Sequence, residues 1–282
     1  MVQAAIAVFI LALVAYSAAA FFAIISWRSG EGRHLSLAKW FTQGGAGLLI
    51  LLFALRWSHW HMLPLTNSFD FINVFALMTS CIVIATQWLT PYSILSIFYL
   101  PPVAAICLMN AFIASRYFLE PPRELQGLFL LVHVGLALFA YALFFVASLT
   151  SAAYLVQVRH LKRPAGQGFV HQLPPLERLD KLLYGLVKLG YPLFAFTLVV
   201  GVVWAWRDRD LLGPSWWLSP KIAMSFFMAM LFSASFHTRR FGILRGPKLA
   251  SLIFFGFNVL LALFLLMSLL GLRNYNFWGQ GA

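Results

Sequence analysis

The sequence predicts an all-α fold, a polytopic integral membrane bundle of eight transmembrane helices. Of the 282 residues, 62% are apolar and 10% are charged, whereas soluble domains carry about 25% charged residues. The apolar runs approach the roughly 20 residues that a helix needs to cross a bilayer. Because lipid allows only helices or closed barrels, and these runs are too long for barrel strands, we expect helices throughout. Residues 1–282 are expected to form one transmembrane domain.

The first two spans are expected at 4–27 and 40–56. No positive charge precedes the first span, and its apolar stretch is longer than the core of a typical signal peptide. We therefore interpret it as a retained helix. The second span is followed by the stretch RWSHWHMLPL, which predicts an exposed link.

Six further spans are expected. The fourth contains Pro101 and Pro102, which should kink it because proline removes a backbone donor. The link before the fifth contains Pro121 and Pro122. Spans three to eight are expected at 70–90, 93–114, 127–157, 186–206, 221–237 and 249–272.

The distribution of positive charge predicts the orientation of these spans. Most of the 20 Lys and Arg residues fall in the links after spans one, five and seven. Cytoplasmic links carry such an excess, so both termini are expected outside the membrane. Orientation then explains the net charge of +12, and no nucleic-acid partner is expected. The residues are Arg28, Arg33 and Lys39 in the first link, Arg159, Lys162, Arg163, Arg178, Lys181 and Lys188 around the second, and Arg239, Arg240, Arg245 and Lys248 in the third.

One sizeable cytosolic insertion is expected at 160–185. It begins with a loop that contains Gly and Pro and continues as LPPLERLDKLLYGL. Leu176, Leu179, Leu183 and Leu186 recur at helical spacing with charges between them. This pattern predicts an amphipathic helix along the cytosolic face of the membrane.

The chemistry available inside the spans is narrow. None of the eight acidic residues falls in the middle of a span, which argues against a proton-driven pump and against hydrolysis by paired carboxylates. No Gly-rich phosphate loop and no HExxH motif occurs. Histidines are therefore the remaining candidates for a functional site.

Three histidines are expected on the outer side of the membrane. His59 and His61 lie in the link after the second span, and His133 lies near the outer end of the fifth. Neutral imidazoles can hold a heme iron from both faces. A single histidine on an apolar helix is more often a packing residue, so only the grouping favours a metal site.

Aromatic and basic residues accompany these histidines. Trp216 and Trp217, in the stretch PSWWLSPK, and Arg123 fall in outer links. Indole rings could cover a planar ligand, and an arginine could bind its carboxylates. The alternative for the tryptophans is the ordinary aromatic belt at a membrane surface. Trp57, Trp60, Arg56 and Arg116 are further outer candidates.

Several stretches resemble the CcsA/ResC-type cytochrome c assembly family. They are LVHVGLALFAYALFFVASLTSAAYLVQVRHLK, LPPLERLDKLLYGLVKLGYPLFAFTLVVGVVWA and SFHTRRFGILRGPKLASLIFFGFN, with a looser match in HMLPLTNSFDF. The resemblance covers roughly residues 55–265. Within the family, the chain looks nearer to the shorter YpjD-like or HemX-like members than to full synthases.

The resemblance implies heme-binding roles for particular residues. His133 corresponds to the family's periplasmic heme ligand, and His237 to its histidine at the cytosolic end of the penultimate helix. Trp216 and Trp217 fall on its tryptophan-rich heme-holding motif. That motif is degraded at Ser219 and Ile222, and Asn274 lies where a second periplasmic histidine is expected.

The expectation is therefore a heme-handling protein of the bacterial inner membrane rather than a complete cytochrome c synthase. It would bind non-covalent b-type heme near its periplasmic face, with both termini periplasmic. Its expected partners are membrane lipid, another membrane protein of the assembly machinery and an apocytochrome c. His61, or its neighbour His59, would be the second ligand beside His133.

Two other functions stay open. The degraded motif also fits an accessory subunit of a membrane complex that kept the scaffold and lost heme. Gln87 and Asn110, which are polar residues within spans, would fit a small-molecule transporter.

Overall fold

The computed structural model describes residues 2–61, 63–65, 68–89, 93–114, 128–161, 173–207 and 220–269. Within these ranges the chain forms eight α-helices and one short 3-10 helix, without a strand. The elements are α1 (Val2–Ser29), α2 (Gly32–Trp60), α3 (Ser68–Leu89), η1 (Ser93–Leu95), α4 (Ser96–Ala114), α5 (Leu128–Leu161), α6 (Leu176–Arg207), α8 (Pro220–Arg240) and α9 (Pro247–Leu269).

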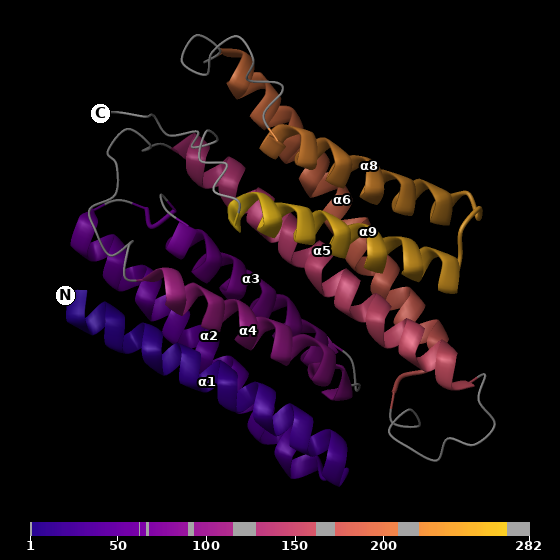
Figure 1. Ribbon diagram of the computed structural model, residues 1–282, viewed down its shortest axis with the longest axis horizontal. Coiled ribbons are helices and arrows are strands. Elements are labelled where there is room, and N and C mark those ends of the chain that lie inside the picture. Colours follow the sequence, from indigo (N-terminus) through magenta and orange to yellow (C-terminus); the bar gives the residue numbers. More distant parts are fainter. Residues whose placement is uncertain are drawn as a thin grey trace.

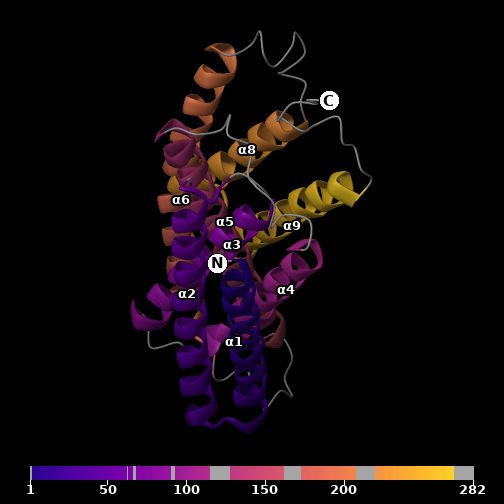
Figure 2. The same ribbon diagram turned by 90° about the vertical axis from the view of Figure 1, so that its left-hand side faces the viewer.

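The helices are arranged as an elongated bundle in which neighbours in sequence run in opposite directions (Figure 1). α1 and α2 form one edge, α3 and α4 come next, and α6, α8 and α9 lie beyond α5 (Figure 1). Seen along the bundle, α2 and α6 lie to one side and α4 and α9 to the other (Figure 2). We call the end where α2 ends and α5 begins the outer end, and the opposite end the inner end.

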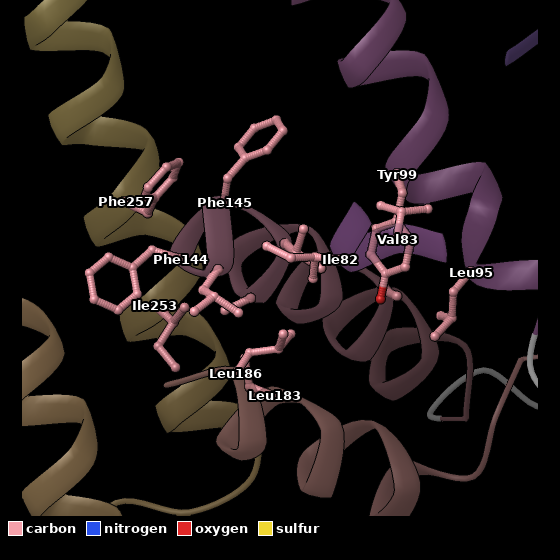
Figure 3. Packing of buried hydrophobic residues seen from close by; sticks show 14 of the residues in the cluster. Ile82, Val83, Leu95, Tyr99, Phe144, Phe145, Leu183, Leu186, Ile253 and Phe257 are labelled. Carbon is pink, nitrogen blue, oxygen red and sulfur yellow. The ribbon is translucent and has the colours of Figure 1, made fainter. Parts of the chain in front are cut away.

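α5 is the centre of the bundle. It packs against α3, α4, α6 and α9. Every residue from 142 to 148 is buried, so this stretch has no exposed side. Because these side chains are buried in the structure itself, protein and not lipid surrounds this stretch of the helix. Figure 3 shows how Phe144, Phe145, Ile253 and Phe257 fill the space beside it.

A glycine lets α5 and α6 approach closely at this centre. A Cβ atom at Gly190 of α6 would lie 2.7 Å from Cε1 of Phe144. The other side of the Phe144 ring stacks on Phe232 of α8, with centroids 3.5 Å apart. Small residues at helix interfaces allow such close packing in lipid, where the hydrophobic effect does not hold helices together.

α1 packs against α2 by the same principle. Ala12, Ala19 and Ala23 are fully or nearly fully buried along α1. The ring of Tyr16 lies over Gly45 of α2, where a Cβ atom would be 3.0 Å from the ring. This edge of the bundle is therefore built from small side chains and one buried ring.

The predicted architecture of a polytopic helical membrane protein is confirmed. In the described part of the chain, five helices are long and apolar enough to cross a membrane, and Ser96–Phe112 and Pro247–Leu263 are shorter apolar helices. Each predicted span coincides with one helix, and α4 continues as a helix through Pro101 and Pro102. α2 begins at Gly32, before the predicted residue 40, because its polar first turns are also helical.

The amphipathic stretch expected before the sixth span differs from the prediction in its arrangement. From Leu176 on it forms the first turns of α6, without a break before the apolar part. Leu179 and Leu183 are fully buried in the core that α5 shares. The leucine stripe therefore packs against protein. Residues 162–172 of the expected insertion lie outside the described residues.

Candidate functional site

The last turn of α2 carries two exposed histidines at the outer end. His59 and His61 both have exposed side chains, and Trp57 beside them is 52% exposed. His61 ends the helix with φ 53° and ψ 26°, and its N–H donates to the carbonyl of Trp57 at 2.8 Å. A left-handed residue at this position closes the helix and turns the chain away.

His133 lies near the outer end of α5, and its ring is directed at α6. A Cβ atom at Gly201 would be 2.6 Å from Cε1 of the imidazole, so the ring lies against the backbone of α6. The imidazole also donates a hydrogen bond to the backbone carbonyl of Thr197. Phe144 lies on Gly190 in the same way, about three turns further along both helices.

The structure brings these histidines to one end of the bundle but in different surroundings. The end of α2 and the start of α5 lie at the outer end (Figure 1), as alternation of the spans predicts. The His133 ring faces α6, while α3 packs against both α2 and α5. His59 and His61 are thus surface groups, and His133 belongs to a helix interface.

His237 lies at the inner end, far along the bundle from the other three (Figure 1). Its exposed ring donates from Nδ1 to the carbonyl of Ser233 at 2.9 Å. The rings of Tyr191, Phe236 and Phe241 surround it, with centroids 5.2–6.4 Å away. It is a separate candidate and shares no site with the outer histidines.

The remaining predicted site residues lie outside the described residues. They are Trp216, Trp217 and Arg123, together with Arg116 and Asn274.

Arg56, considered from the sequence as a partner for carboxylates of a ligand, has a different environment. Its Nε lies 2.6 Å from Oδ1 of Asp70, and its Nη2 donates to Oδ2 at 3.1 Å. The two side chains are 4% and 3% exposed. We call this pair the outer ion pair. This pairing could have been predicted from the sequence, because residues of opposite charge flank a short link between two antiparallel spans.

A second ion pair lies near the inner end. Nη2 of Arg239 in α8 donates to Oδ2 of Asp180 in α6. The side chains are 22% and 15% exposed. We call this the inner ion pair. From the sequence, Arg239 was expected only to contribute to the excess of positive charge in the inner links.

The two polar residues that suggested a transporter bind other parts of the protein. Gln87 donates from Nε2 to Oγ of Ser96 at 2.9 Å. Asn110 donates from Nδ2 to the backbone carbonyl of Phe69 at 3.1 Å. Both amide NH2 groups therefore bind neighbouring helices, while the amide oxygens of Gln87 and Asn110 are buried without a hydrogen-bond partner among the described residues.

The donor set at the outer end is compatible with heme. Within the described ranges, no group of three or more His, Cys, Asp or Glu residues could hold a metal ion, but heme iron takes only one or two protein ligands. Histidines that bind metals usually donate their other ring nitrogen to a carboxylate or carbonyl. The bond from His133 to Thr197 has this form, although Nδ1 of the same ring is buried within the protein, whereas His59 and His61 are accessible to a ligand.

Comparison with known proteins extends these observations over most of the chain. The pattern of the family described as cytochrome C assembly protein matches residues 46–273. The chain is 28% identical to the cytochrome c biogenesis protein CcsA of Chlamydomonas reinhardtii, over 82% of this chain and 66% of that protein. It is 29% identical to protein HemX of Brevibacillus brevis, over 58% of this chain and 60% of that protein.

A third relative matches over nearly its whole length. The cytochrome c biogenesis protein CcsA of Prochlorococcus marinus is 24% identical, over 89% of this chain and 87% of that protein. The match thus spans less than two thirds of the length of the first two relatives and most of the third. No solved structure matches the chain.

Proposed function

Because the chain belongs to the cytochrome c assembly protein family, we propose that it acts in cytochrome c biogenesis by handling heme. The family match over residues 46–273 carries this proposal, since it includes all four candidate histidines. Heme would be non-covalent and of the b type. It would be bound near the outer end, which we propose faces the periplasm of a bacterial plasma membrane; the excess of positive charge in the inner links supports this orientation.

The proposed ligands come from two elements. His133 would supply one imidazole, oriented by its hydrogen bond to Thr197. His59 or His61 would supply another from the exposed end of α2. Trp216, Trp217 and Arg123 are proposed as further contacts to the ring and its carboxylates. Heme supplies the redox-active iron, and these residues bind and orient it.

His237 is proposed as a separate, inner ligand. Its Nδ1 donates to Ser233, which leaves Nε2 of a neutral ring as the coordinating atom. Completion of that site would need a ligand from a partner protein. Partners of this kind are another membrane protein of the assembly machinery and an apocytochrome c.

Heme loading tests the proposal. The protein, purified in mild detergent and incubated with hemin, should show b-type absorption bands on reduction. His133→Ala should lower heme affinity by about tenfold or more, as loss of groups around a metal typically does, and the double variant H59A/H61A should do the same. His160→Ala is the matched control, because this exposed histidine lies at the inner end of the same helix as His133. Absence of bands from the loaded wild type would refute heme handling.

The packing of His133 favours a second candidate, an accessory subunit that kept the scaffold and lost heme. His133 lies on Gly201 as Phe144 lies on Gly190, so its ring also serves helix packing. This candidate predicts that His133→Phe preserves the assembly and activity of the complex. Purification from native membranes would then yield a partner membrane protein and no heme.

A further inference from the structure

The outer ion pair joins the two ends of the segment that carries His59 and His61. Arg56 is in the last full turn of α2, and Asp70 is in the first turn of α3, 14 positions later. Nε and Nη2 of the arginine meet the two carboxylate oxygens separately, at 2.6 and 3.1 Å. Such two-point contact fixes the orientation of both side chains as well as their distance.

Arg56 is also the last buried side chain of α2 in the described part. Residues 57–59 and His61 are exposed. Pro64 and Leu65, which follow in the chain, are buried. The exposed histidines therefore lie between Arg56 and Asp70, and the outer ion pair joins the two ends of this segment, which we call its base.

The base of this segment is anchored to every helix of its half of the bundle. Phe69, fully buried beside Asp70, packs edge-on against Phe9 of α1 with centroids 5.0 Å apart. Cζ of Arg56 lies 5.4 Å from the centroid of the Phe69 ring. The carbonyl of Phe69 accepts the hydrogen bond from Asn110 of α4. α1, α2, α3 and α4 thus meet at two consecutive residues.

We propose that Arg56 and Asp70 are positioning residues for the outer histidines. By closing the base of the segment they hold the last turn of α2, and with it His59 and His61, at a fixed place on the outer end. This inference rests on the proposed function. Neither residue touches the ligand; both act through the backbone that carries the imidazoles.

Replacing both residues of the pair distinguishes an effect on the position of the histidines from an effect on the stability of the protein. In the variant R56M/D70L two apolar side chains fill the space, a replacement that is often neutral for buried ion pairs. We expect thermal stability near that of the wild type and heme affinity about tenfold lower, the effect usual for groups that orient metal ligands. R56K keeps the charge but loses the two-point contact, so an intermediate affinity is expected. R239M/D180L removes the inner ion pair; compared in a His237→Ala background, which lacks the proposed inner ligand, it should leave heme affinity unchanged.

A heme-independent measurement accompanies the titration. A nitroxide on Ser58→Cys, with Cys81 and Cys107 replaced by alanine, reports the mobility of the exposed turn. R56M/D70L should increase its mobility, and R239M/D180L should not. If the wild type binds no heme, the proposed function fails, and the mobility of the nitroxide alone tests the positioning role. An unchanged spectrum in R56M/D70L would then overturn that role. If the wild type binds heme, unchanged affinity in a folded R56M/D70L protein overturns it.

Discussion

The outer and inner ion pairs use the same chemistry in different surroundings. Each joins an arginine to an aspartate on another helix, and each arginine also lies over an aromatic ring. These rings are Phe69 and Tyr184, 5.4 and 5.6 Å from the arginine Cζ atoms. The outer side chains are 4% and 3% exposed, and the inner ones 22% and 15%. Water therefore reaches one pair and hardly reaches the other.

The space beside the outer ion pair is small, and most of the side chains that line it are apolar. A pocket of about 10 Å³ is lined by both residues of the pair and by Asn73, and a pocket of that size holds about one water molecule. Asn73 is 7% exposed, and neither atom of its amide has a hydrogen-bond partner among the described residues. Burial is therefore expected to decide how much each ion pair contributes to stability.

The largest effect is expected from breaking the outer ion pair on one side. Asp70→Asn leaves the shape nearly unchanged but removes the negative charge that faces the buried guanidinium of Arg56. We expect the free energy of unfolding to fall by about 3–5 kcal/mol. Chemical denaturation in detergent measures this change. A loss below about 1 kcal/mol would mean that water solvates Arg56 and that the two pairs do not differ.

A smaller effect is expected from the same change in the inner ion pair. Asp180→Asn leaves Arg239 partly hydrated and still over Tyr184, so the expected loss is about 1 kcal/mol. At 1 M salt, where charges are screened over about 3 Å, the difference from wild type should shrink for Asp180→Asn and persist for Asp70→Asn. Equal salt dependence in the two variants would contradict the assigned difference in burial.

The sequence predicted the helices well because their signal is local. Long apolar runs with few charges allow one structure in lipid, and each predicted span coincides with a helix. The ends of α2 and α6 were harder to predict, because their first turns are polar or amphipathic and remain helical beyond the apolar stretch. Hydropathy reports where lipid contacts a helix and does not report where the helix begins.

The site was predictable only in part. Alternation of the spans was enough to bring His59, His61 and His133 to one end of the bundle. The direction of the His133 ring was not predictable, because it depends on Gly201 in another helix. Arg56 was named as an outer candidate, but its pairing with Asp70 depends on how the link between α2 and α3 folds. Contacts between elements, unlike spans, leave no periodic pattern in the sequence.

The smallest effect on stability is expected from a third ion pair, which is the most exposed of the three and serves as the reference for the other two. Nζ of Lys181 lies 2.6 Å from Oε1 of Glu177, one turn away on α6, and the side chains are 63% and 77% exposed. Both ions keep most of their hydration when the contact breaks, so Lys181→Gln should leave the unfolding midpoint unchanged within error. The measurement is the denaturation used for the two aspartate variants. A loss as large as that of Asp180→Asn would show that burial does not order the three pairs, because a contact open to water would then contribute as much as a partly buried one.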